Sequence, residues 1–75
     1  MKLTQRLTAI TEREDGGYVA LCPELDIASE GASIEEARTN LIEALTLFFE
    51  TAAPSEVARR FHSEVFVTQV EVPVG

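Results

Sequence analysis

Alternation of apolar and polar residues predicts a half-buried β-strand over residues 2–12. Leu3, Leu7 and Ala9 fall on one face of this strand, and Lys2, Thr4, Arg6 and Thr8 fall on the other. The segment that follows, residues 12–18, contains Asp15-Gly16. This pair favours a two-residue hairpin turn because both residue types tolerate positive φ. The start of the chain is therefore typical of a β-hairpin.

Two further strands are predicted after the turn. Residues 18–22, YVALC, are apolar on both faces, which indicates a central strand or one that is covered on both sides. Pro23 has no N–H to donate to a ladder, so this strand ends there. Residues 27–31, IASEG, predict a short third strand that stops at Gly31.

A long helix is predicted from Ser33. Ser33 and Glu36 form a capping box, in which the Ser33 hydroxyl accepts from the Glu36 N–H and the Glu36 carboxylate accepts from the Ser33 N–H. Spacing of 3.6 residues places one apolar stripe on the helix: Ile34, Ala37, Leu41, Ala44, Leu45, Phe48 and Ala52. Ile42 and Phe49 widen this stripe, so we expect them to pack at the sheet rim or against a second subunit.

Pro54 ends this helix by about Ala53 and favours one further helical turn. Residues 63–74 then alternate again, which predicts a last strand that Pro73 ends. Its faces are Phe66, Thr68, Val70 and Val72 on one side, and Val65, Val67, Gln69 and Glu71 on the other. The predicted fold is a single α+β domain over residues 1–75, a β-β-β-α-β two-layer sandwich with an antiparallel meander and one main helix on one face.

The net charge of the chain indicates which classes of partner it can bind. Thirteen acidic and six basic residues give a net charge of −7, and no segment is basic. Nucleic-acid binding requires a clustered positive surface, so the charge favours a basic protein partner instead. A single cysteine allows no intrachain disulfide, and no apolar run approaches the length of a membrane span, so we expect a cytoplasmic protein. So short a chain buries only about 60% of its surface, which favours a homo-oligomer.

Few residues are candidates for chemistry. Acidic neighbours of Cys22 disfavour its thiolate, so we interpret Cys22 as a small buried apolar residue. His62 is the one histidine, and no spacing typical of metal ligands is present. We therefore expect no catalytic residue, no metal, no cofactor and no enzyme activity. Asp15, Glu24 and Asp26 fall in loops, where they form either an acidic patch for a partner or ordinary turns and surface corners.

The motifs DGGYVA, CPEL, SIEEA and LFFE follow one another in an order that resembles the HicB-like antitoxin family. The resemblance covers residues 1–50, and FVTQVEV looks like the closing strand of short members. It implies a degenerate ribonuclease H-like fold and a role in a toxin–antitoxin pair. The implied partner is a HicA-like toxin, a small basic ribonuclease that cleaves mRNA. Such domains commonly assemble as dimers or higher homo-oligomers.

The chain departs from the family pattern in two places, and it also differs from catalytic ribonuclease H folds. Many members carry a C-terminal DNA-binding domain, whereas this chain stops at Gly75 after a predicted strand. We therefore expect a short, single-domain member without direct nucleic-acid binding. Asp26-Ile27-Ala28 stands where many members have Pro-Gly-Cys. The first strand also lacks the acid that catalytic ribonuclease H folds need.

The leading hypothesis is an antitoxin-like protein that binds and occludes a small basic mRNA-cleaving toxin. The residues expected to contact the toxin are Asp15, Tyr18, Glu24 and Asp26. The alternative is a stand-alone homo-oligomeric acidic interaction module without a toxin partner. The residues expected between its subunits are Ile42, Leu47 and Phe49. A residual nuclease or other small hydrolase is the third hypothesis.

Overall fold

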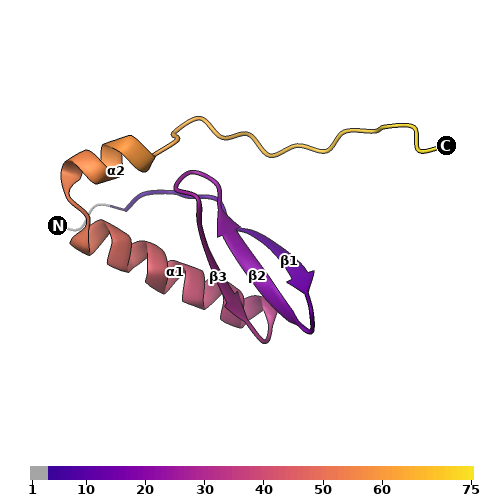
Figure 1. The fold of residues 1–75 in the computed structure, drawn as a ribbon, viewed down its shortest axis with the longest axis horizontal. Helices are drawn as coiled ribbons and strands as arrows, with labels where there is room; N and C mark the ends of the chain where they lie inside the picture. Colours follow the sequence, from indigo (N-terminus) through magenta and orange to yellow (C-terminus); the bar gives the residue numbers. More distant parts are fainter. Residues whose placement is uncertain (1–3) are drawn as a thin grey trace.

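The computed structural model describes residues 4–75, in which three strands precede two helices (Figure 1). The elements are β1 (Ile10–Glu14), β2 (Gly17–Cys22), β3 (Ile27–Gly31), α1 (Ile34–Thr51) and α2 (Pro54–Arg60). The strands form an antiparallel sheet in the order β1-β2-β3, and α1 packs on one face of it. The α+β class, the meander and the central position of β2 are therefore confirmed.

The first strand is shorter than the alternation predicts. Its ladder begins at Ile10, and the predicted positions Lys2 and Leu3 lie outside the described residues. The hairpin turn fixes the register so that Ile10 pairs with Leu21, and β2 ends one residue later. The ladder therefore has no further partner for residues 4–9. Leu7 nevertheless packs against the core from this segment.

The prediction of a last strand over residues 63–74 is wrong, because the structure has no strand there. Residues 63–75 form neither a ladder nor a turn, and they leave the domain as one extended segment (Figure 1). Within residues 4–75 the sheet thus has three strands rather than four. Alternation determines which side chains share a face, but a strand also requires the edge of another strand. Residues 63–75 are termed the tail below.

The start of α1 follows the predicted cap with one difference. The Ser33 Oγ accepts from the backbone N–H of Glu36 at 3.1 Å. The Glu36 carboxylate accepts from the backbone N–H of Ala32 at 2.6 Å, one residue before the predicted donor. The helix ends at Thr51, slightly before the predicted end, and Pro54 opens α2 as expected.

Close contact between β3 and α1 depends on Gly31. A Cβ at this position would lie 2.4 Å from the backbone nitrogen of Ala37 and 2.8 Å from the carbonyl carbon of Glu36. These backbone atoms cannot move aside, so only glycine fits. The Asn40 side-chain amide also donates to the carbonyl of Glu30 at 2.8 Å. Helix α1 is therefore held against β3 and makes far less contact with β1.

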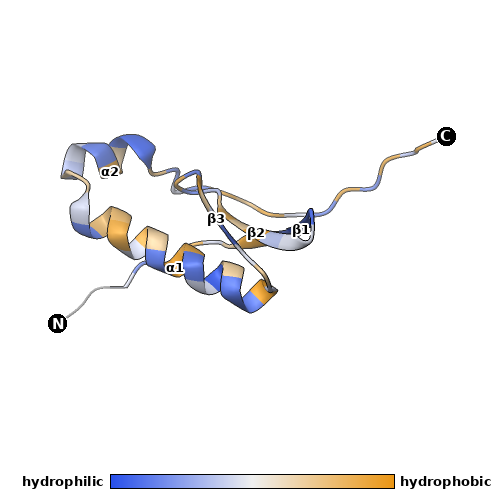
Figure 2. Cartoon of the chain, turned by 60° about the horizontal axis from the view of Figure 1, so that its bottom comes forward, coloured by the Kyte–Doolittle hydropathy of each residue, from blue (hydrophilic) through white to orange (hydrophobic). Residues whose placement is uncertain are grey.

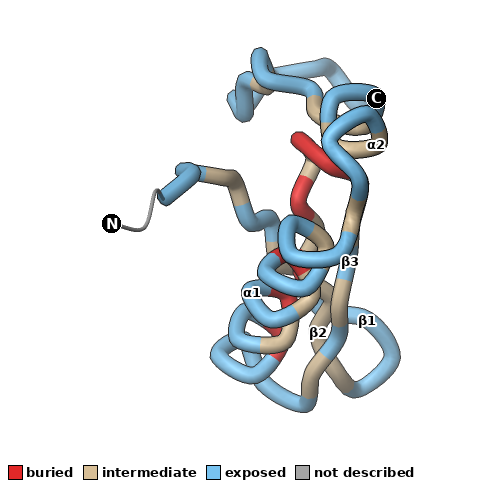
Figure 3. Tube along the Cα trace, turned by 90° about the vertical axis from the view of Figure 1, so that its left-hand side faces the viewer, coloured by how far each residue is buried: buried red, intermediate tan, exposed pale blue. Residues whose placement is uncertain are grey.

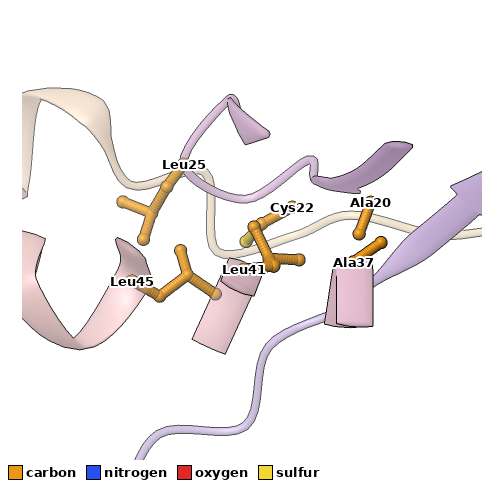
Figure 4. Close-up of a cluster of buried hydrophobic side chains, with 6 residues drawn as sticks. All are labelled: Ala20, Cys22, Leu25, Ala37, Leu41 and Leu45. Carbon is orange, nitrogen blue, oxygen red and sulfur yellow. The ribbon is translucent and has the colours of Figure 1, made fainter. Parts of the chain in front are cut away.

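The core lies between α1 and the sheet (Figures 3 and 4). Ala20 and Cys22 come from β2, Leu25 from the corner after it, and Ala37, Leu41 and Leu45 from α1. The helix contributes its predicted stripe, although Ile34 at the first turn is exposed. Since the largest fully buried side chains are two leucines and a cysteine, the monomer has a small apolar core.

Candidate functional site

Three carboxylates gather at the hairpin end of the sheet. Asp15 and Gly16 both have positive φ, 41° and 83°, which gives the tight turn between β1 and β2. This turn presents Glu14 and Asp15. The pairing of β2 with β3 brings Glu30 to the same end, because Glu30 lies opposite Val19.

These residues line an open groove, here termed the hairpin groove. Its lining consists of Glu14, Asp15, Gly16, Gly17, Tyr18, Val19, Glu30 and Gly31. All three carboxylates are exposed, so each remains available to a ligand in solvent. Glycines at the turn keep the groove open, and the carboxylates give it a negative potential. Such a groove is complementary to a lysine or arginine side chain.

Tyr18 is held in place beside the groove. The Arg13 guanidinium donates to the Tyr18 hydroxyl at 2.7 Å and lies 5.3 Å from the centre of the ring. The ring is partly buried and packs against the core. Tyr18 therefore presents an oriented, polar-tipped aromatic surface of the kind that is enriched in protein interfaces.

The four predicted toxin contacts do not form one surface. Asp15 and Tyr18 lie at the hairpin end, whereas Glu24 and Asp26 lie in the corner between β2 and β3. The six-residue strand β2 separates the two ends by roughly 20 Å. The structure therefore brings together half of the predicted residues and leaves the other half at the opposite end of the sheet.

Glu24 is buried, whereas the sequence predicted that it lies at a surface corner. Its side chain is only 8% exposed. The Thr8 backbone N–H donates to both carboxylate oxygens at 3.0 and 3.2 Å, and the Thr8 hydroxyl donates at 2.6 Å. The carboxylate is thus used within the chain and is not presented to a partner. Asp26 is exposed and adopts a positive φ of 56°.

Burial and hydrogen bonding together shift the pKa values of Glu24 and Cys22 in this corner. Burial by itself raises the pKa of Glu24, but hydrogen bonds from Thr8 outweigh it and hold that pKa below its ordinary value. Burial raises the pKa of the Cys22 thiol, and the Glu24 carboxylate beside it raises that pKa further. The Cys22 Sγ donates to Glu24 Oε1 at 3.4 Å. Cys22 is therefore a buried neutral thiol, as predicted.

Helix α2 closes the same corner from the other side. The Arg60 guanidinium donates to the carbonyl of Leu25 at 2.9 Å and lies 5.4 Å from the centre of the Phe48 ring. The backbone N–H of His62 donates to the carbonyl of Glu24 at 2.7 Å. This end of the sheet is consequently committed to internal contacts, which leaves the hairpin groove as the candidate functional site.

The residues predicted at a subunit interface are all exposed. Ile42, Leu47 and Phe49 have exposed fractions of 46%, 59% and 39%. Ile42 and Phe49 stand two turns apart on one flank of α1, whereas Leu47 projects from a different side of the helix. One flat partner surface therefore covers Ile42 and Phe49 without reaching Leu47.

Sequence reasoning missed Glu14 and Glu30 in the groove. Glu14 falls in the predicted turn over residues 12–18 and Glu30 in the predicted strand over residues 27–31, and neither pattern shows which residues of β3 lie opposite β2. A signal was present in the two-residue turn and in Gly31, which together set the register. The roles of Thr8 and Arg60 depend on contacts 16 and 35 residues away along the chain, for which the sequence carries no local signal.

Across residues 4–75, no three His, Cys, Asp or Glu side chains lie close enough together to hold a metal ion. None of the helices in this part of the chain has the length and hydropathy needed to cross a bilayer.

Comparison with known proteins identifies relatives of this chain. UPF0150 protein ssl0738 of Synechocystis sp. is 38% identical over 69 residues, which cover 89% of this chain and 94% of that protein. UPF0150 protein ssr1765 of the same organism is 46% identical over 46 residues, 59% of this chain and 58% of that protein. No family model matches the chain, and no solved structure matches it significantly. Because the first similarity extends over nearly the whole of both proteins, the chain belongs to the UPF0150 family.

Proposed function

We propose that this protein is an antitoxin-like member of its family that binds a small basic mRNA-cleaving toxin of the HicA-like kind and occludes it. The observation that carries the proposal is the hairpin groove, where Glu14, Asp15 and Glu30 surround an opening beside Tyr18. A groove with three exposed carboxylates attracts the lysine and arginine side chains with which a ribonuclease binds RNA. The protein then acts by covering that basic surface and transforms no substrate.

Whole-chain electrostatics support the same partner. The net charge of −7 is spread so that α1 also presents an acidic outer face, formed by Glu35, Glu43 and Glu50. A field of this sign accelerates encounter with a basic protein and opposes encounter with RNA. The electrostatic field of the protein would therefore attract a basic toxin and repel RNA.

The resemblance to HicB-like antitoxins supports the proposal at the level of sequence. DGGYVA forms the hairpin turn and the start of β2, so the motif contributes directly to the groove. The resemblance also implies a ribonuclease H-like sheet with a fourth strand. In this protein that strand would come from the tail, once the tail finds an edge with which to pair.

Growth rescue tests the proposal. If a reading frame beside this one encodes a short basic protein, that protein is expressed with and without this chain, and we expect growth arrest only when this chain is absent. Binding is then measured with purified proteins for the variant Glu14→Gln/Asp15→Asn/Glu30→Gln. We expect the dissociation constant to rise by about tenfold or more, because three charge-assisted contacts are weakened.

A matched control separates the groove from overall charge. The variant Glu35→Gln/Glu43→Gln/Glu50→Gln removes the same number of charges from the outer face of α1. We expect its dissociation constant to change by less than about threefold. Equal loss in the two variants would refute the groove as the contact surface. Continued arrest in cells that contain soluble antitoxin would refute the function itself.

A further inference from the structure

The tail is an exposed segment with the pattern of a strand. Phe66, Val70 and Val72 are 85%, 79% and 66% exposed. Hydrophobic stretches alternate with polar ones along the tail (Figure 2), and no turn or bend interrupts it. An extended apolar segment of this kind has unpaired backbone groups as well as exposed side chains, so it is a template for pairing with another strand.

The chain exposes more surface than a compact protein of its mass, enough to form an interface of ordinary size. The chain exposes 6287 Å², whereas a compact protein of this mass exposes about 4,500 Å². Its radius of gyration is 14.5 Å, against about 11 Å for a compact chain of this length. The surplus surface is roughly twice the ~800 Å² that each partner buries in a stable interface.

The path of the tail directs it away from its own sheet. The His62 N–H is bonded to Glu24, and Arg60 is bonded to Leu25, so the point of departure is fixed at the β2–β3 corner. From there the tail runs extended and away from the sheet (Figure 1). Ten extended residues reach roughly 33 Å, about twice the length of β1.

Of the two outer strands, β1 has the edge that can receive it. The opposite edge strand, β3, is held against α1, and the Asn40 amide occupies the carbonyl of Glu30. Helix α1 makes little contact with β1, and within residues 4–75 β1 pairs only with β2, which leaves its outer edge without a ladder. Every copy of the chain therefore offers one free edge and one free strand.

An apolar flank lies beside that edge. Ile42 and Phe49 stand on the side of α1 opposite Asn40, which faces β3, so they face the side of β1. Phe49 also shares a groove with Gln5, in the segment that leads into β1. Across the sheet, Ile10 of β1 is 39% exposed on the other face. A strand added here thus meets apolar side chains on both of its faces.

We propose that tail residues 64–72 pair with the free edge of β1 in a second copy of the chain, and that two copies exchange tails around a twofold axis. The face with Phe66, Val70 and Val72 covers Ile42 and Phe49 of the second copy. The opposite face, with Val65 and Val67, lies beside Ile10. When two copies exchange tails, each free β1 edge gains a paired strand. The assembly is then closed, as in other domain-swapped dimers.

Sedimentation equilibrium and mixed-label NMR test the exchange on the full chain. We expect twice the mass of one chain at micromolar concentration. In a sample that mixes isotopically labelled and unlabelled chains, we expect contacts between the tail and β1 to be intermolecular. Tail amides should exchange with solvent about tenfold or more slowly than in an unstructured peptide.

A pair of variants with equal charge isolates the tail face. Phe66→Asp/Val70→Asp places two carboxylates in the covered face, and we expect the dimer dissociation constant to rise by about 100-fold or more. Ser63→Asp/Val74→Asp adds the same charge outside residues 64–72, and we expect a change below about threefold. Both variants should keep the helical circular dichroism signal of the parent, because the altered side chains at positions 63, 66, 70 and 74 are exposed and lie outside the helices.

Three results would overturn the proposal. A monomer at micromolar concentration would exclude self-exchange and leave the edge of β1 to a different protein. Contacts between the tail and β1 within one copy would show that the strand closes its own sheet. Equal weakening of the dimer by the two variants would show that charge, not the covered face, controls assembly. None of these results bears on whether the hairpin groove binds a toxin.

Discussion

At the scale of single residues, Glu24 connects parts of the chain that are distant in sequence. Its carboxylate accepts from Thr8 and Cys22, and its carbonyl accepts from His62. A buried carboxylate is tolerated only when hydrogen bonds replace its water, and here the N-terminal segment supplies most of them. The residue therefore stabilises the position of residues 4–9, which have no ladder of their own.

Replacing Glu24 with glutamine should destabilise the fold in a pH-dependent way. Glutamine keeps the shape but loses the charge that Thr8 stabilises, so we expect the free energy of unfolding at pH 7 to fall by about 1–3 kcal/mol. Because the folded pKa of Glu24 is below its ordinary value, its stabilisation is present above the unfolded pKa of about 4.3. It is lost as the pH falls through the folded pKa.

The difference between the parent and Glu24→Gln should therefore shrink below about pH 4. Urea unfolding at a series of pH values measures it. The exposed residue Glu43 provides the control, since Glu43→Gln should stay within about 0.5 kcal/mol of the parent throughout. A difference for Glu24→Gln that is constant with pH would contradict the assignment.

At the scale of elements, Arg60 is the side chain within α2 that hydrogen-bonds the helix to the β2–β3 corner. The helix has seven residues, none of them buried, and so short a helix is not stable by itself. Arg60 attaches it through Leu25 and the Phe48 ring, whereas Arg59 makes only an exposed pair with Glu56. The two neighbouring arginines thus have different roles that their sequence position does not reveal.

We expect Arg60→Ala to loosen α2 without unfolding the sheet. Loss of the Leu25 hydrogen bond and of the ring contact should raise amide exchange in residues 54–62 by about tenfold, while α1 and β2 keep their protection. Hydrogen exchange resolved by residue measures this effect. Arg59→Ala is the matched control and should leave exchange nearly unchanged, since exposed ion pairs contribute little. Similar exchange in both variants would show that Arg60 does not anchor the helix.

The sequence predicts an element well when its contacts join residues that are near one another in the chain. It predicts an element poorly when those contacts join distant residues. The capping pattern at Ser33 and the stripe that includes Leu41 predict α1 well, because both depend on residues within four positions of one another. The alternation of residues 2–12 predicts too long a strand, because the ladder ends where Pro23 ends β2. At the candidate site, the turn places Asp15 correctly, but the approach of Glu30 depends on the pairing of β3.

At the scale of the whole molecule, the net negative charge has opposite effects on the two proposed assemblies, the homodimer and the toxin complex. A net charge of −7 repels a second copy of the chain and attracts a basic toxin. Tail exchange therefore relies on apolar burial and backbone pairing, while toxin binding relies on the carboxylates of the hairpin groove. Like and opposite charges respond oppositely to screening, which makes the two assemblies separable by salt.

Raising the ionic strength from about 0.1 M to 1 M shortens the screening length from about 10 Å to about 3 Å. We expect the dissociation constant of the homodimer to fall and that of the toxin complex to rise, each by about tenfold. Analytical ultracentrifugation and titration calorimetry at several salt concentrations measure the two constants. Parallel changes in the two constants would contradict the separation of the two surfaces.

The sequence by itself determined the local conformations: the Asp15-Gly16 turn, the central strand that Pro23 ends, the cap at Ser33 and the amphipathic helix. It also determined the acidic charge. These follow from near neighbours along the chain, whose periodicity and φ preferences are readable in order. Only the tertiary structure decided that Glu24 is buried, that Glu14 and Glu30 line one groove, and that the tail has no partner strand within the described domain. Each of these depends on which distant edges and side chains come together, and periodicity along the chain carries no information about that.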